Sequence, residues 1–219
     1  MVLKSNSRSV SGAGSPRRAR RRDARRDDIL RAAGRIFRAR GFADSGMRDI
    51  AEAADLSPAN LYHYFRGKDE ILFYCQDRAV DRMLGAVAEA RRATASHEAR
   101  LRQVLATHVR TLLDEIDGAS AHVHLDVLAA PLRARIVAKR DRYERAVRRL
   151  VEDGVRAGAF AAPDPALVTR AMLGAVNWTV TWFRHEGPQA TDKLAASIAA
   201  YLVRGVVLKP AAARRLTLV

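Results

Sequence analysis

The segment between residues 45 and 68 constrains the fold most, because SGMRDIAEAADLSPANLYHYFRGK predicts two short helices joined by a tight turn. Ser57 followed by Pro58 is a strong helix start, since serine caps the first free amides and proline needs no amide partner at that position. Ser45 can cap the first of the two helices. Ala51 is small enough to let the two helices approach closely, and Gly67 ends the second one. Two short helices in this arrangement are typical of a helix-turn-helix.

The rest of the chain has helical periodicity, which predicts an all-α protein with about nine helices and no strand. Apolar residues from Ile29 to Phe37 form one stripe, and Gly41 stands where a helix C-cap is expected. The expected helices cover about 23–40, 46–54, 58–65, 68–92, 96–116, 120–129, 131–157, 165–185 and 190–204. The expected divisions are a disordered basic arm (1–22), a helix-turn-helix domain (23–68), a helical bundle (69–208) and a tail (209–219).

The chain is strongly basic, with 39 lysines and arginines against 24 acidic residues and a net charge of +15. Residues 1–26 contain nine of the basic side chains and one acid, Asp23. Such an excess favours a polyanionic partner, although an arginine- and alanine-rich chain also results from a GC-rich genome. Two interpretations of the arm stay open: it follows phosphates or enters a minor groove, or it is a solvated tail with only nonspecific attraction to DNA.

The segment from Asp27 to Leu72 resembles the DNA-binding domain of the TetR family of transcriptional regulators. The residues that carry the resemblance are Ala32, Ala33, Phe37, Gly41, Phe42, Ile50, Ala51, Ser57, Asn60 to Phe65, Lys68, Ile71 and Leu72. One departure is Asp55, which occupies a turn position commonly held by glycine. Aspartate tolerates a left-handed backbone better than most residues, so we expect the turn to be retained.

The resemblance and the side-chain chemistry together predict the DNA contacts. Asn60 and Tyr62 are expected to face the major groove, where asparagine can read adenine with two hydrogen bonds. Phosphate or base contacts are expected from the side chains of Arg48, His63, Tyr64 and Lys68, and close backbone approach at Ser57 and Pro58. For the tyrosines, plain core packing is the alternative. The implied partner is a pseudo-palindromic double-stranded DNA operator.

In TetR-type proteins the last two long helices usually pair with those of a second copy. The resemblance therefore implies a homodimer whose interface involves residues 165–185 and 190–204. The expected interface residues are Met172, Val176, Val180, Phe183, Leu194, Ile198 and Tyr201.

The stretch AVNWTVTWFRHEGP, residues 175–188, resembles a subgroup that regulates fatty-acid and steroid breakdown and often responds to acyl-CoA. The resemblance implies a repressor released by a small apolar or acyl-CoA-like effector. A regulator of multidrug or hydrophobic-compound responses, with a non-CoA ligand, is the alternative. Candidate ligand-binding residues are Tyr74, His108, Leu112, Trp178 and Trp182. The arginines of 131–157 would suit a phosphate-rich ligand, or else form a solvated face with pairs such as Glu144–Arg148.

Other function classes have little support in the sequence. No glycine-rich phosphate loop, metal-spaced cluster or nucleophile beside a base is present, so we expect no enzyme activity, no metal and no cofactor. His122, His124 and Asp126 are too few on one helix face for a metal site. No apolar run is long enough to span a membrane, and the single thiol, Cys75, suits a reducing cytoplasm. A sequence-independent DNA coat that uses the arm is a further alternative.

Overall fold

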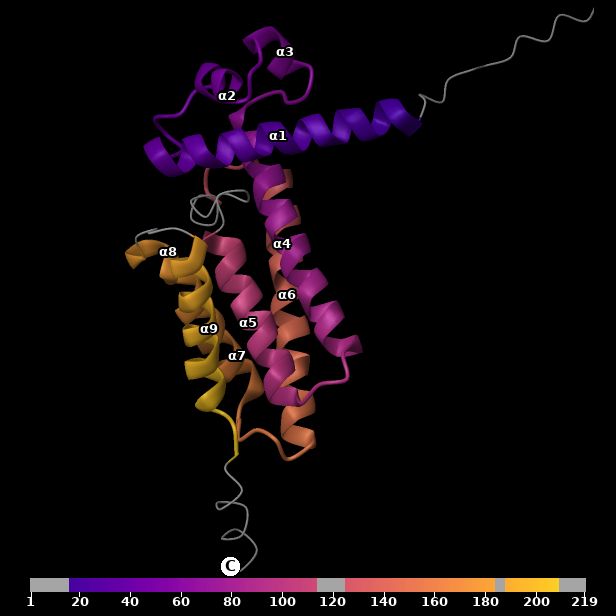
Figure 1. The fold of residues 1–219 in the computed structure, drawn as a ribbon, viewed down its shortest axis with the longest axis vertical. Helices are drawn as coiled ribbons and strands as arrows, with labels where there is room; N and C mark the ends of the chain where they lie inside the picture. The colour runs from indigo at the N-terminus through magenta and orange to yellow at the C-terminus, as the bar shows by residue number, and fades with distance from the viewer. Residues whose placement is uncertain (1–15, 114–124, 184–187, 209–219) are drawn as a thin grey trace, which may run out of the picture.

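The computed structural model describes residues 16–113, 125–183 and 188–208. This part of the chain forms nine helices (Figure 1) and no strand, apart from one antiparallel bridge between Phe160 and Val207. The prediction of an all-α fold is therefore confirmed. The helices are α1 (Pro16–Arg40), α2 (Met47–Ala53), α3 (Pro58–Tyr62), α4 (Lys68–Arg92), α5 (His97–Leu113), α6 (Ala130–Arg156), α7 (Pro165–Asn177), α8 (Thr179–Trp182) and α9 (Pro188–Arg204). Among them, none is both long and apolar enough to cross a bilayer.

The N-terminal core forms where α1, α2, α3 and the first turns of α4 meet. In Figure 1, α1 lies across the end of α4, and α2 and α3 lie on the far side of α1. The fully buried side chains include Phe37 from α1, Ile50 from α2 and Leu61 from α3. Burial of such side chains stabilises each by about 1.5–3 kcal/mol, which fixes the short helices on the long ones.

The first turns of α6 also belong to this N-terminal core. Leu128 and Ile136 are buried in it, although they lie more than fifty residues downstream of α4's first turn. Phe73 of α4 completes the contact, because the Arg135 guanidinium lies 4.7 Å from the centre of its ring. The expected boundary at residue 68 therefore does not separate two cores, since α4 and α6 both contribute to the N-terminal one.

The C-terminal core is a bundle of the remaining parts of α4 and α6 with α5, α7 and α9. Helix α5 runs through its centre, and α9 packs mainly on α5. The apolar spacing expected from sequence is present, since Leu101, Leu105 and Leu112 of α5 are all buried. Leu112 is thus a core residue of this bundle.

Several element boundaries differ from the expected ones. Helix α3 ends at Tyr62 instead of about residue 65, with His63 as its C-cap. Helix α1 begins at Pro16, so residues 16–22 are helical instead of disordered. Proline at a first turn and the good helix propensity of arginine explain this start. The expected helix over 120–129 lies partly outside the described residues, and 125–129 form turns. The expected 165–185 helix is divided at Trp178, where β-branched residues follow and the Thr179 hydroxyl donates to the Val176 carbonyl at 2.8 Å.

Substitution of Gly154 tests the packing between the end of α6 and Phe160. A Cβ at Gly154 would lie well inside van der Waals contact with the Phe160 ring. We expect Gly154→Ala to lower the free energy of unfolding by about 2 kcal/mol or more, measured by chemical denaturation. Gly85→Ala is the matched control, because Gly85 is also a glycine within a helix and a Cβ added there meets no atom within 4 Å. The control should raise stability by roughly 0.5–1 kcal/mol, and equal destabilisation of both variants would contradict this packing.

Candidate nucleic-acid interface and effector cavity

The turn between α2 and α3 holds its backbone in the left-handed region at Asp55, where φ is 59°. The amide of Leu56 donates to the carbonyl of Ala51 at 2.9 Å and closes the turn. The expectation that aspartate replaces the usual glycine without loss of the turn is confirmed. This geometry sets the angle between the two helices of the motif.

Helix α2 begins differently from the sequence-based expectation. Gly46 is its N-cap, and the Asp49 carboxylate accepts from the Gly46 amide at 2.8 Å. Ser45, the expected cap, is buried and donates its hydroxyl to the carbonyl of Gly41 instead. Arg40 pairs with the same Asp49 at 2.8 Å, so the start of α2 is tied to the end of α1. Arg48, the second residue of α2, is exposed.

Helix α3 presents one face to solvent and buries the other. The Ser57 hydroxyl caps it by accepting from the Asn60 amide at 3.2 Å, as the Ser-Pro start predicts. Leu61 is fully buried, whereas Tyr62 is 55% exposed and Asn60 and His63 are also exposed. The helix thus offers polar and aromatic side chains outward on a short, firmly anchored support.

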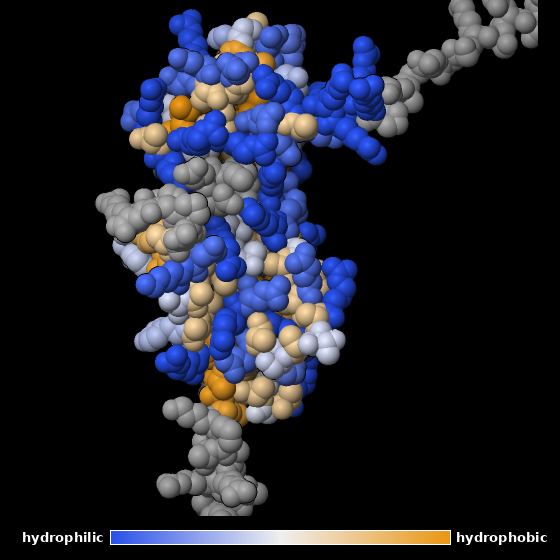
Figure 2. Space-filling model, viewed as in Figure 1, coloured by the Kyte–Doolittle hydropathy of each residue, from blue (hydrophilic) through white to orange (hydrophobic). Residues whose placement is uncertain are grey.

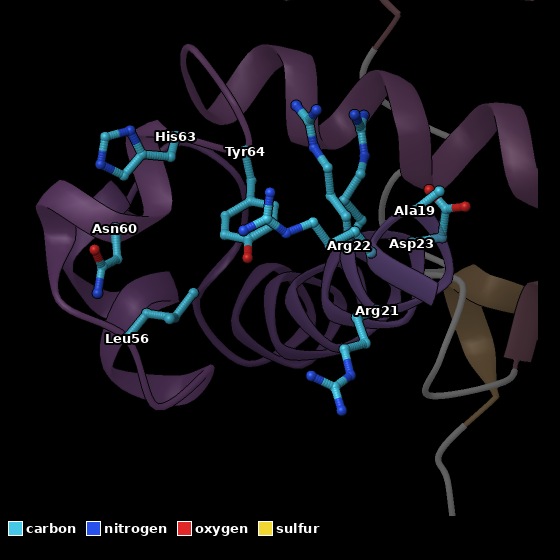
Figure 3. Close-up of a pocket in the computed structure, with 10 residues that line it drawn as sticks. Ala19, Arg21, Arg22, Asp23, Leu56, Asn60, His63 and Tyr64 are labelled. Atoms are coloured by element: carbon cyan, nitrogen blue, oxygen red, sulfur yellow. The ribbon is translucent and has the colours of Figure 1, made fainter. Parts of the chain in front are cut away.

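An open cleft of about 1060 Å³ lies between α3 and the start of α1. Figure 3 shows Asn60, His63 and Tyr64 on one side of it and Ala19, Arg22 and Asp23 on the other. Tyr64 is half-buried and packs against the N-terminal core, as the core-packing alternative predicts, and its contact with DNA stays a prediction. Sequence reasoning did not place the arginines of α1 beside α3, because that contact depends on how α1 crosses the domain.

Lys68 has a structural role that differs from the expected phosphate contact. Its ammonium donates to three backbone carbonyls, those of Phe42 at 2.9 Å, Ala43 at 3.1 Å and Ser45 at 2.9 Å. It also lies 4.6 Å from the centre of the Phe42 ring. Because an ammonium group has three N–H donors, all of them are used to fix the loop between α1 and α2.

A second, smaller cavity of about 190 Å³ lies in the C-terminal bundle among α4, α5, α6 and α7. Its lining mixes apolar and polar side chains: Val80, Met83, His108, Arg140, Asp141, Tyr143, Glu144, Leu173 and Asn177. The His108 Nδ1 and the Tyr143 hydroxyl are 3.1 Å apart. Burial lowers the pKa of His108 to about 4, against a hydrogen bond with Asn177 that raises it, and nearby Arg140 lowers it further. Burial raises the pKa of Tyr143, so both groups are neutral near pH 7.

Of the candidate ligand-binding residues, the structure places only His108 at this cavity. Tyr74 packs edge-on against Phe65, and the centre of its ring lies 4.5 Å from the Arg26 guanidinium. Tyr74 is not among the residues that line the cavity. Trp178 and Trp182 are 65% and 50% exposed on the outside of the bundle. The i,i+4 spacing of the two tryptophans could not show which side of the helix faces inward.

The expected dimer-interface residues also occupy different environments. Met172 and Val176 are buried inside the subunit's own core and cannot contact a partner in this conformation. Val180, Phe183, Leu194 and Ile198 are partly buried against the same core. Tyr201 on α9 is 77% exposed. On α7, Leu167 is 63% exposed and shares a helix face with Trp178, an apolar surface that sequence reasoning missed.

Metal and thiol chemistry have no clear place in this part of the structure. His122 and His124 lie outside the described residues, and Asp126 is exposed. Across the ranges that the structure describes, no group of three or more histidine, cysteine, aspartate or glutamate side chains could hold a metal ion. Cys75 is buried in the N-terminal core, as its apolar neighbours in the sequence predict.

Two family models match this chain. Residues 29–75 match the bacterial regulatory proteins of the tetR family, and residues 94–206 match the tetracyclin repressor-like C-terminal domain. Both models describe transcriptional regulators, which confirms the prediction that the chain is a regulator and not an enzyme.

Individual relatives agree with this assignment. The transcriptional activator FasR of Mycolicibacterium smegmatis is 39% identical over 92 residues, 41% of this chain and 42% of FasR, so this chain matches less than half of that relative. The repressor KstR2 of the same species is 23% identical over 201 residues, covering 84% of this chain and 91% of KstR2. The solved structure of AibR with isovaleryl coenzyme A and operator DNA has a TM-score of 0.69 at 23% identity, covering 82% of this chain and 98% of AibR, which shows a shared fold.

The buried histidine predicts a specific pH dependence of stability. The unfolded chain protonates His108 near pH 6.5, whereas the folded chain does so only near pH 4. Stability is therefore lost as pH falls through this window, by about 3 kcal/mol at about 1.4 kcal/mol per pKa unit. Chemical denaturation gives the free energy of unfolding at pH 7 and at pH 4. Between these two pH values, His108→Gln should lose less stability than the parent protein, by about 3 kcal/mol. Equal losses in the variant and the parent would contradict a neutral, buried His108.

Proposed function

Since the chain belongs to the TetR family of bacterial regulatory proteins, we propose that it is a cytoplasmic repressor that binds a pseudo-palindromic operator as a homodimer. A small ligand in the C-terminal bundle releases it. The observation that carries the proposal is the outward face of α3, where Asn60, Tyr62 and His63 are exposed while Leu61 anchors the helix. A short helix with a polar outer face and a capped start suits insertion into a major groove about 12 Å wide.

Base reading falls to the residues that project furthest from the core. The Asn60 amide has the donor and acceptor pair that matches adenine N7 and N6. Tyr62 adds an aromatic ring and a hydroxyl on the next exposed position. Arg48 on α2 supplies a flexible cation for a phosphate or a base edge. Lys68 is left out of the interface, because its donors are used on the α1–α2 loop.

Dimerisation rests on the exposed apolar side chains of α7 and α9. Leu167 lies on α7, Trp178 directly follows the last residue of α7, and Tyr201 lies on α9. Large exposed apolar side chains are candidates for contact with another protein surface. A second copy of the chain covers them and places two α3 helices about one DNA turn apart, roughly 34–36 Å, as operator symmetry requires.

The size and lining of the bundle cavity restrict the effector. At about 190 Å³ the cavity holds a short acyl group or a small apolar molecule, and not a complete coenzyme A. His108 and Tyr143 give it neutral polar groups that suit a carbonyl or hydroxyl oxygen. AibR, whose solved structure contains isovaleryl coenzyme A, supports a short acyl thioester as the effector. The cavity volume would leave the nucleotide of such a ligand outside. A non-CoA hydrophobic compound is the second candidate, favoured by the small volume.

The contacts of α6 give a route from the cavity to DNA. Arg140 lines the cavity and donates to the side chain of Gln76 on α4 at 3.1 Å. The preceding residue, Lys139, binds the Asp77 carboxylate at 2.6 Å. Since Ile136 lies one turn earlier in the N-terminal core, a ligand that moves α6 also moves the support of α3. The ligand must bind one of the two arrangements more tightly to shift this equilibrium.

We expect Tyr62→Ala to abolish operator preference, because it removes a side chain that projects from the outer face of α3 without touching the core. Duplexes selected from a random pool by the parent protein supply the operator. In fluorescence anisotropy the parent should prefer the selected duplex to a scrambled one by roughly 10³-fold, and the variant should bind both about equally. Retention of the parent's preference would remove Tyr62 from base recognition.

We expect Tyr201→Glu to dissociate the homodimer, since it places a charge on an apolar surface that is covered only by a second copy. Size-exclusion chromatography with light scattering should show a monomer for Tyr201→Glu and a dimer for the parent and for Tyr62→Ala. The two variants thus control for each other. A dimeric Tyr201→Glu protein would place the interface elsewhere.

A further inference from the structure

The first three turns of α1 have an unusual composition for a helix start. Residues 16–28 precede the segment that matches the tetR family model, which begins at residue 29. Within them, Arg17, Arg18, Arg20, Arg21, Arg22, Arg25 and Arg26 are accompanied by few acids, and the first turn has none. The positive end of the helix dipole disfavours cations here, and the arginines repel one another. A bound polyanion would offset both costs.

Two of these arginines fix the extension to the helix-turn-helix. Arg25 donates to the Asp55 carbonyl at 3.1 Å, at the turn before α3. The Arg26 guanidinium lies 4.8 Å from the ring centre of Phe65 and 4.5 Å from that of Tyr74. These contacts set the direction of α1 relative to α3.

The other five arginines have no such anchoring role. Arg17, Arg18, Arg20, Arg21 and Arg22 are exposed, and none makes a hydrogen bond or ion pair within the part of the chain that the structure describes. Figure 2 shows that hydrophilic side chains cover the part of α1 that projects beyond the domain. Their positive charge is therefore available to an external partner.

The shape of the surface selects the partner. Arg18, Arg21 and Arg22 line the cleft of about 1060 Å³, and Asn60 and His63 of α3 line its opposite wall (Figure 3). A polyanion in the cleft would thus contact the arginines and the recognition helix at once. Of the polyanions, a DNA duplex already held by α3 is the one whose backbone must pass beside that helix.

We propose that residues 16–26 are a second DNA-binding element, in which a sugar-phosphate strand lies in the cleft and its phosphates bind Arg18 and Arg22. This inference rests on the proposed DNA-binding function and extends it beyond the helix-turn-helix. Arg18 and Arg22 are four residues apart and share the cleft face of α1. At about 100° of rotation per residue, Arg20 points about 180° away from this face and Arg17 about 120° away, and neither lines the cleft. The element adds affinity for any sequence, since phosphates carry no base information.

The test compares two double variants with equal charge loss on one helix. Arg18→Ala/Arg22→Ala removes the two cations assigned to the phosphates, and Arg17→Ala/Arg20→Ala is the matched control, because neither Arg17 nor Arg20 lines the cleft. Alanine favours helix, so circular dichroism should show both variants folded. Anisotropy with a 40-base-pair mixed-sequence duplex over a range of salt should give the cleft variant a slope of log K against log salt that is smaller by about 1.8, for two lost phosphate contacts. The control should keep the parent's slope.

The outcomes separate the inference from the proposed function. A weaker slope only in the cleft variant supports a phosphate strand in the cleft. Equal slopes for both variants overturn it. If both slopes are lowered, only the net charge of the helix matters, and if both are unchanged, neither pair of arginines binds phosphate. Failure of the parent protein to bind any duplex would overturn the proposed function itself.

Discussion

The recognition surface depends on holding α3, a helix of five residues, in place. Nucleation makes so short a helix unstable in isolation, so α3 exists only because other elements support it. Leu61 is buried in the N-terminal core, Ser57 caps the first turn, and Asp55 sets the entry angle through its left-handed backbone. The outer face of α3 is then free to carry the exposed side chains of Asn60, Tyr62 and His63.

The same dependence explains why distant parts of the chain meet beneath α3. Phe65 and Phe73 lie in a core that also contains Leu128, just before α6, and Ile136 of α6. Further along, α6 lines the cavity that contains His108 and Tyr143. One helix is thus shared by the DNA-binding core and the effector cavity. Packed cores have discrete arrangements and do not deform continuously, so a small displacement of α6 is transmitted to the support of α3.

The sequence predicts local features of this site better than contacts between distant residues. The Ser57 cap, the Gly41 helix end and the turn at Asp55 follow from backbone preferences that neighbouring residues determine. The role of Lys68 does not, because its three carbonyl acceptors lie more than twenty residues upstream. Nor does the arginine-rich start of α1, which has the composition of a disordered arm and becomes part of a cleft only through the crossing of α1 and α3.

The most direct test of this account is methylation interference on a selected operator duplex, since dimethyl sulfate marks guanine N7 in the major groove and adenine N3 in the minor groove. If α3 lies in the major groove, methylation of guanine N7 within each half-site should block binding, and methylation of adenine N3 within the same half-sites should not. Interference by adenine N3 alone would place the protein in the minor groove and contradict the role assigned to α3.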